Sequence, residues 1–181
     1  KELLTNPEKI AQDKEFTVMQ ILKIRTPRRF IKLRLTIEME RRLNFLTSQV
    51  RFGQHRRYQD WLQRQYFNTQ ESQMLRCDMI RYICCYIHPT NETLASDIFP
   101  RWALIGWVLS VCNSHVLSSY AKLALFYDWL FFDDRDQVNS MIMDVEPGIL
   151  VMFYSLKNYP GITAALIYFL CRVCFLFLYF W

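Results

Sequence analysis

The feature that most constrains this chain is the stretch of residues 121–132, in which only Lys122 and Asp128 are polar. A helix of that length reaches only about 18 Å, which is short of the roughly 30 Å hydrocarbon core of a bilayer. A helix that is apolar on nearly every side and cannot span a membrane must be covered by protein from several directions. The stretch therefore predicts an internal helix in an assembly of many helices.

The remaining sequence also has helical patterns. Met39, Leu43, Leu46 and Val50 recur at helical spacing and mark one buried helix face. No segment alternates between apolar and polar residues in the way a half-buried strand does. The chain of 181 residues contains only four glycines, which argues against a sheet with many tight turns and against glycine-rich phosphate loops.

Capping and breaking residues predict where the helices begin and end. The expected helix starts are Asn6 followed by Pro7, Thr36, Asn91, either Asn113 or Ser114, and Ile162. The expected ends and interruptions are Gly53 as a C-cap, Pro100, Pro147 before or within a helix over 149–159, and Pro160 with Gly161. The two helices that flank Phe52 and Gly53 should form an antiparallel hairpin.

These boundaries predict an all-α fold of about eight or nine helices joined by short loops. Hairpins that follow one another without a change of composition favour a HEAT-like or armadillo-like solenoid over residues 1–172. Residues 173–181, "VCFLFLYFW", form an atypical hydrophobic tail. Residues 162–181 contain a single charge, Arg172, and are long enough to span a bilayer. A membrane-associated helix is therefore an alternative to a buried solenoid helix at this end.

Charge is unevenly distributed along the chain. The formal net charge is +5, and most of the lysine and arginine lies before residue 102. A basic region over residues 23–57 is interleaved with aromatic residues, a composition that suits an acidic protein partner or single-stranded nucleic acid, although a solvated helix face is equally compatible. The candidate partner-binding residues are Arg25, Arg28, Arg29, Lys32, Arg34, Arg56 and Arg57.

The sequence offers little that could carry catalysis or hold a cofactor. The three histidines form no metalloprotease pattern, and "DDRDQVNSMIMD" lacks the spacing of a calcium loop. Cys171 and Cys174 resemble half of a zinc site, but no second pair lies near them in the sequence. Most cysteines fall inside apolar helical patterns, so we expect free thiols and a reducing compartment. We expect no enzyme activity, no metal and no cofactor.

Several long strings resemble the third subunit of the Integrator complex, a family that is also a component of the sensor of single-stranded DNA (SOSS) complex. The strings are "RLTIEMERRLNFLTSQVRFGQHRRYQDWLQRQYF" (34–67), "LRCDMIRYIC" (75–84), "IFPRWALIGW" (98–107), "AKLALFYDWLFF" (121–132) and "ITAALIYFLCR" (162–172). The resemblance covers nearly all of residues 24–172 and places the chain inside the N-terminal region of a longer protein. Residues 173–181 do not resemble the family.

The resemblance implies a non-catalytic HEAT-type scaffold in the nucleus, with the cytoplasm as a second compartment. The implied partners are other Integrator subunits, an OB-fold single-stranded-DNA-binding protein and a small third subunit, so that nucleic acid is contacted indirectly. The implied processes are double-strand-break repair, checkpoint signalling, small nuclear RNA processing and transcription. Direct binding of single-stranded nucleic acid through residues 23–57 is the alternative function.

Overall fold

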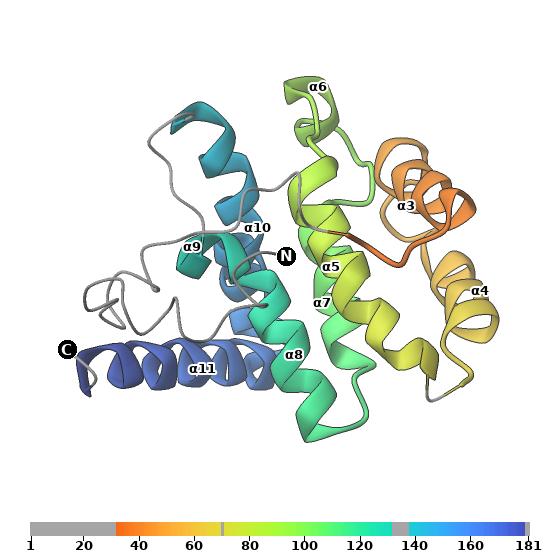
Figure 1. Ribbon diagram of the computed structural model, residues 1–181. Coiled ribbons are helices and arrows are strands. Elements are labelled where there is room, and N and C mark those ends of the chain that lie inside the picture. The colour runs from red at the N-terminus through yellow and green to blue at the C-terminus, as the bar shows by residue number, and fades with distance from the viewer. Residues whose placement is uncertain (1–31, 70, 132–137, 180–181) are drawn as a thin grey trace, which may run out of the picture.

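The computed structural model describes residues 32–69, 71–131 and 138–179, and most of these residues are helical (Figure 1). In that part of the chain there are nine α-helices, one 3-10 helix and no strand, apart from an isolated antiparallel bridge between Arg51 and Ile98. The all-α prediction is thus confirmed for the described residues.

The helices follow one another with short connections, and their bounds are as follows. They are α3 (Ile37–Gln49), α4 (Arg56–Tyr66), the 3-10 helix η3 (Glu71–Met74), α5 (Leu75–Tyr86), α6 (Asn91–Leu94), α7 (Arg101–Ser110), α8 (His115–Leu125), α9 (Tyr127–Phe131), α10 (Val138–Asn158) and α11 (Pro160–Tyr179).

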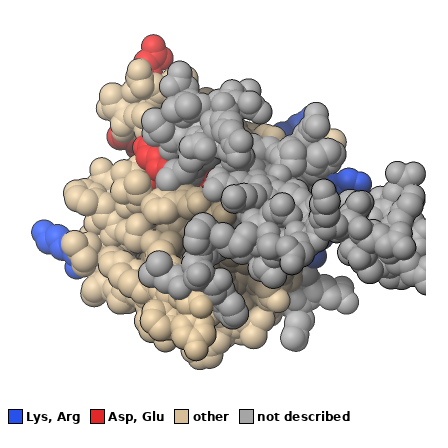
Figure 2. Space-filling view, turned by 60° about the vertical axis from the view of Figure 1, so that its left-hand side comes forward, with Lys and Arg blue, Asp and Glu red and all other residues tan. Residues whose placement is uncertain are grey.

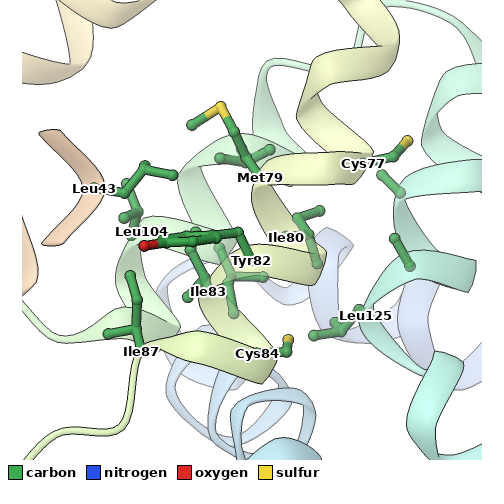
Figure 3. Close-up of a cluster of buried hydrophobic side chains, with 14 of the residues drawn as sticks. Leu43, Cys77, Met79, Ile80, Tyr82, Ile83, Cys84, Ile87, Leu104 and Leu125 are labelled. Atoms are coloured by element: carbon green, nitrogen blue, oxygen red, sulfur yellow. The ribbon is translucent and has the colours of Figure 1, made fainter. Parts of the chain in front are cut away.

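Helix α5 lies at the centre of the molecule. Helices α7, α8 and α10 pack against it, and the α3–α4 pair stands on the remaining side (Figure 1). Figure 3 shows α5 side chains, Ile80 and Ile83 among them, lying between Leu43 of α3, Leu104 of α7 and Leu125 of α8. Every α5 residue from 76 to 85 is buried except Asp78, so α5 is the most completely covered helix of the described part.

Two buried arginines join the central helices by charged hydrogen bonds. Arg81 of α5 donates to both carboxylate oxygens of Asp128 at 2.8 and 3.2 Å, and so fixes α5 against the α8–α9 segment. Arg101 of α7 donates to the Ile87 carbonyl at 2.8 Å and to Glu146 of α10 at 2.9 Å. A buried charge without a partner costs several kcal/mol, so these pairs fix the register of the helices they join.

The structure confirms several predicted boundaries. Thr36 caps α3, its hydroxyl accepting from the Met39 N–H, and Ser114 caps α8 in the same way. Two separate helices, α6 and α7, occupy the segment in which Pro100 predicted an interruption, and Pro100 is the N-cap of α7. The predicted core face of α3 is also correct: Met39, Leu43, Leu46 and Val50 are all buried.

Four other boundaries were predicted wrongly. Helix α3 ends with Val50 as its C-cap, and Gly53 lies in the turn beyond it with φ of 100°. Thr90, not Asn91, caps α6, because the Thr90 hydroxyl accepts from the Thr93 N–H. Pro160 is itself the first residue of α11, where its missing N–H costs nothing, so this helix begins before Ile162.

The fourth correction concerns α10, which begins at Val138 and contains Pro147 in its interior. Pro147 and Gly148 are both buried against the preceding helices. A Cβ on Gly148 would lie 3.0 Å from Cε1 of Phe126, so this part of α10 packs closely on the residues that follow α8. Tertiary packing of this kind compensates for the hydrogen bond that a proline removes from a helix.

Residues 121–130, the part of this stretch whose burial the structure describes, are buried or half-buried as the sequence predicts, although they belong to two helices. The break lies at Phe126, between α8 and α9, and Ala121, Leu125, Phe126 and Asp128 are buried. At the start of α8, before this stretch, Val116 is 65% exposed and Tyr120 is 49% exposed.

Some predictions fall on residues outside the described ranges. These are the Asn6 and Pro7 start, the arginines at 25, 28 and 29, and the acidic loop at 133–137. Among the helices that the structure does describe, none is both long enough and apolar enough to cross a membrane.

Candidate interaction surface

Helix α4 has two exposed faces, and each lines a hollow. The turn before α4 is held by the isolated bridge, in which the Phe52 N–H donates to the Asp97 carbonyl and the Phe99 N–H donates to the Val50 carbonyl, both at 2.7 Å. This bridge places the start of α4 beside the start of α7. A surface hollow lies at this junction.

We call this hollow the α4–α7 groove. Its volume is about 420 Å³, and α10 and the first turn of α11 close it on the far side. The lining residues are Phe52, His55, Arg56, Gln59, Phe99, Trp102, Ala103, Gly106, Trp107, Ser110, Val151, Tyr154, Ser155, Asn158, Tyr159 and Ile162. The groove is therefore assembled from segments that lie far apart in the sequence.

The walls of the groove are stacked aromatic rings. The rings of His55 and Phe99 are parallel, with centroids 4.2 Å apart and an interplanar angle of 9°. Trp102 of α7, another lining residue, stacks on Tyr154 of α10 at 4.2 Å and 15°. Phe52 lies against His55 at a centroid distance of 5.3 Å. Stacked pairs of this kind hold one another in place and give the groove rigid apolar walls.

The groove has a positive charge and no negative one among the residues that line it. No aspartate or glutamate is in that lining. Arg56 contributes a guanidinium group that makes no hydrogen bond or ion pair with the described residues. Burial, together with the neighbouring Arg56 charge, lowers the pKa of His55, so that its imidazole ring is neutral at neutral pH. The electrostatic character of the groove is thus set by Arg56.

The side of the groove formed by α7 contains a glycine. Gly106 lies in the interior of α7, and a Cβ built on it would meet no described atom within 4 Å. Glycine in a helix interior costs roughly 0.5–1 kcal/mol relative to alanine. No side chain of the described residues uses the space that the missing Cβ leaves open.

The second face of α4 forms a smaller hollow with α3, which we call the α3–α4 hollow. Its volume is about 290 Å³, and its lining includes Arg42, Phe45, Arg57, Tyr58 and Trp61. Arg42 lies over the Trp61 ring at 5.1 Å, and Arg57 lies over the Tyr58 ring at 4.8 Å. Both arginines also have polar partners, Glu38 for Arg42 and the Tyr58 hydroxyl for Arg57.

The structure separates the candidate binding residues that the sequence grouped together. Arg56 lies in the α4–α7 groove, and Arg57 lies in the α3–α4 hollow. Arg34 is exposed, and its Nε donates to Asp78 of α5 at 2.9 Å. Lys32 is exposed as well. The role of these residues in partner binding stays a prediction.

Sequence reasoning missed most of the residues that form the groove. Trp102 and Trp107 are half-buried in its lining, and neither was among the candidate binding residues. The available signal was the pair of tryptophans, Trp102 and Trp107, that flank Gly106 within "RWALIGW". Two large aromatic residues around a helical glycine indicate a surface that is apolar but open.

A third feature is an exposed apolar surface on α10 and α11. The exposed large side chains there are Ile149, Phe153, Tyr154, Leu156, Tyr159, Ile167, Tyr168, Phe175, Leu176 and Tyr179. On the side of the molecule seen in Figure 2, the described surface carries few charged side chains, with acidic ones in the upper part of the view and basic ones toward its edges. Contiguous apolar surface is typical of regions that contact other proteins.

The described residues contain no group of three or more side chains suited to holding a metal ion. The cysteines of the central helix are buried, and burial raises the pKa of the Cys77 thiol to about 11 and that of Cys84 to about 12. A reactive cysteine needs the opposite shift, because the thiolate is the nucleophile. Cys171 and Cys174 are free and exposed on α11.

Comparison with known proteins identifies the family. Residues 1–179 match the family described as Integrator complex subunit 3 N-terminal, so the expectation that the tail lies outside the family is wrong for residues 173–179. The chain belongs to the Integrator complex subunit 3 family. It is 56% identical over 175 residues to human Integrator complex subunit 3, and 56% identical over 174 residues to the protein of that name from Danio rerio. The homologue from Anopheles gambiae is 55% identical over 173 residues.

These alignments cover 96% of this chain but only 16% of the human protein, 17% of the Danio rerio protein and 16% of the Anopheles gambiae homologue. The α4–α7 groove and the central core both lie within the residues that match the family.

Proposed function

We propose that this chain is a non-catalytic scaffold segment of an Integrator-type complex in the nucleus, with the cytoplasm as a second compartment. Its partners are other Integrator subunits, an OB-fold single-stranded-DNA-binding protein and a small third subunit. Through these partners it serves double-strand-break repair, checkpoint signalling, small nuclear RNA processing and transcription. The names of the relatives support a role in the Integrator complex.

The scaffold has the architecture of a HEAT-like solenoid. In such an array, corresponding helices of successive hairpins pack side by side. The contacts of α5 with α8 and of α7 with α10 fit this arrangement. Helix α11 packs on α10 and also contacts α7 and α8. The second helix of a regular hairpin would contact fewer of the preceding helices.

The single observation that carries the binding role is the composition of the α4–α7 groove. Aromatic residues and arginine are enriched at the centres of protein interfaces, and aspartate and glutamate are depleted there. The groove has this composition, with rings from four segments, a guanidinium that pairs with no described residue, and no acidic residue in its lining. Rigid stacked walls also lower the entropy lost when a partner binds.

The described ionisable groups support a structural role rather than catalysis. Two of the buried charges pair across helices, Arg81 with Asp128 and Arg101 with Glu146. The buried thiols of α5 have raised pKa values, which suppresses nucleophilic character at neutral pH. Each of these groups has a packing role between helices.

The test is capture of partners from nuclear extract. The tagged chain is incubated with extract treated with nuclease, and the captured proteins are identified by mass spectrometry. We expect Integrator subunits and an OB-fold single-stranded-DNA-binding protein to be enriched over a control helical protein of equal charge. If neither class is enriched after nuclease treatment, the proposed scaffold role is wrong for this segment.

Direct binding of single-stranded nucleic acid is the second candidate function, and the α3–α4 hollow favours it. Aromatic rings beside arginines are the composition of single-strand binding surfaces, and Arg42 and Arg57 lie over Trp61 and Tyr58 in this hollow. Both arginines already have partners, however, and this weakens the case.

A gel shift with the purified chain and a deoxythymidine oligonucleotide separates the two functions. A scaffold shifts the oligonucleotide only when the OB-fold protein is added. Tight binding by the chain alone, which falls steeply as salt rises, would establish the second function instead. The variant Arg57→Glu should then abolish the shift, and Arg41→Glu, an exposed change on α3 outside the hollow, should retain it.

A further inference from the structure

We propose that the α4–α7 groove is the docking site for a short acidic segment of a partner protein, one that carries aromatic or branched apolar side chains. The inference rests on the proposed scaffold function and adds to it the site and the chemistry of the occupant. It assigns a function to Arg56, Gly106 and the two stacked pairs of the groove.

The first argument is charge complementarity. Arg56 lies at the groove with its guanidinium unpaired among the described residues, and none of the lining residues is acidic. The other ionisable ring at the site, His55, is neutral at neutral pH, because its pKa is lowered by burial and by the charge of Arg56. A carboxylate next to Arg56 would therefore gain a charge-assisted hydrogen bond and meet no like charge among the groove residues.

The second argument is the apolar surface beside that charge. Phe52 is 56% exposed, Tyr154 is 46% exposed and Tyr159 is 66% exposed, and all three line the groove. Trp102 and Trp107 add two half-buried indole rings. Tryptophan, tyrosine and arginine are the residues that most often dominate the binding energy of an interface. An occupant that only carried charge would leave this surface uncovered.

The third argument is Gly106. Its missing side chain leaves α7 open toward the groove, and no atom of the described residues fills that space. Close approach of an external backbone to a helix is one of the recognised uses of a glycine in a helix. The α7 residues on the groove, from Trp102 to Ser110, extend over about 12 Å, which accommodates roughly four residues of an extended peptide.

The geometry of the rings favours a protein segment over nucleic acid. Bases bind by stacking on free aromatic faces. In this groove the rings of Trp102 and Tyr154 stack on each other, and so do those of His55 and Phe99. One face of each ring is therefore already covered by its neighbour and cannot stack on a base. Arg56 is also the only arginine or lysine in the groove lining, and it would neutralise only one phosphate of a strand.

The experiment uses the purified full chain and a phage-displayed library of random dodecapeptides. We expect the selected peptides to combine aspartate or glutamate with phenylalanine, leucine or tryptophan. A synthetic peptide of the consensus sequence is then titrated, and its dissociation constant is measured by calorimetry. A selection that yields no binders, or binders without acidic residues, would overturn the proposal.

Two variants locate the site, each with a matched control. Gly106→Leu fills the groove and should raise the dissociation constant of the peptide at least tenfold. Gly106→Ala adds one methyl group in open space, so its dissociation constant should stay within about threefold of that of the original chain. Arg56→Glu should weaken binding roughly tenfold or more, whereas Arg41→Glu makes the same charge change outside the groove and should have little effect.

The circular dichroism spectrum and the thermal unfolding curve of each variant are measured to check that it is still folded. Alanine and leucine are better helix formers than glycine, so both Gly106 variants should stay folded. Equal affinity of the consensus peptide for the original chain and for Gly106→Leu would place the binding elsewhere and sink the proposal. A deoxythymidine oligonucleotide is also tested for its ability to displace the peptide. If it displaces the peptide from the original chain but no longer binds Gly106→Leu, the groove is a nucleic-acid site instead.

The outcome is separable from that of the capture experiment. Peptide binding is measured with purified components, so it can succeed even if no Integrator protein is captured from extract. Conversely, if capture succeeds and is unchanged in Gly106→Leu and Arg56→Glu, the scaffold function stands and the groove proposal fails.

Discussion

Helices α5 and α11 show that the more apolar of two helices need not be the more buried one. Helix α11 has a single charged residue, Arg172, whereas α5 has Arg76, Asp78 and Arg81. Yet α5 is buried at nearly every position, and within α11 only Thr163 and Leu166 are buried among the side chains that the structure describes. From composition alone, α11 would be expected to be the more buried of the two helices.

The difference comes from the number of neighbours around each helix. Helix α5 is enclosed by α3, α7, α8 and α10. Two of its charged groups are paired, Arg81 with Asp128 of α9 and Asp78 with Arg34, which precedes α3. Helix α11 lies along one side of the molecule against α10, α7 and α8 (Figure 1). Its outer face, which includes Tyr168 and Phe175, is exposed. Burial therefore follows position in the packing, and polar residues are tolerated inside when they are paired.

Thiol labelling gives the largest contrast between the two helices. Cys171 and Cys174 of α11 are exposed, whereas Cys77, Cys84 and Cys85 of α5 are buried. Burial raises the pKa of Cys77 to about 11 and of Cys84 to about 12, so little thiolate forms at pH 8. We expect the α5 thiols to react with iodoacetamide at least a thousandfold more slowly than the α11 thiols, since labelling requires opening of the core. Peptide mapping by mass spectrometry measures both rates, and equal rates would break the comparison.

Removal of one member of the buried ion pair should cost the most stability. Asp128 is fully buried, and Asp128→Ala leaves the Arg81 guanidinium without its carboxylate. We expect a loss of about 3–5 kcal/mol in the free energy of unfolding, measured by urea denaturation. The double variant Arg81→Met with Asp128→Leu should lose much less, because no unpaired charge stays in the core. A double variant as unstable as the single one would show that the pair contributes more than charge compensation.

A matched pair of isoleucine substitutions tests the same contrast for apolar residues. Ile83 of α5 is 0% exposed, and Ile167 of α11 is 49% exposed. We expect Ile83→Ala to destabilise the chain by about 2–5 kcal/mol through the cavity it creates. Ile167→Ala should change stability by less than about 0.5 kcal/mol, as is usual at exposed positions. Similar losses for both variants would mean that something covers α11 in solution.

The last comparison is between the two arginines of α5, Arg81 and Arg76, and the expected loss of stability for Arg76 is small. Arg76 is 3% exposed, and its Nε and Nη1 atoms find no hydrogen-bond partner among the described residues. Its guanidinium lies over the Phe67 ring at 4.2 Å, and burial lowers its pKa. Because little charge pairing is lost, we expect Arg76→Met to change the free energy of unfolding by less than about 1 kcal/mol. A loss as large as that of Asp128→Ala would show that Arg76 has a strong partner in solution.

The sequence predicted best those features that depend on one helix at a time. The spacing of Met39, Leu43 and Leu46 identified a core face, because a helix that buries one side repeats its apolar residues at a fixed period. The caps at Thr36 and Ser114 were predictable for the same local reason. The early start of α10 was not, because Pro147 is compensated by contacts with distant helices.

The groove was still harder to predict, since Phe52, Trp102 and Tyr154 come from separate segments that only the fold brings together. The sequence did single out Arg56, but for its place in a basic run rather than for a neighbouring aromatic wall. Composition can thus predict that a chain binds partners, whereas the location of the site requires the packing of the helices.

The isolated bridge between Arg51 and Ile98 also bears on the order in which the chain folds. Its two hydrogen bonds join segments that are distant in the sequence, so they form only after the entropy of closing a long loop has been overcome. Helical hairpins, by contrast, are stabilised by local contacts and form early. We therefore expect the groove to be completed late in folding, so that a partner which recognises it selects fully folded molecules over intermediates.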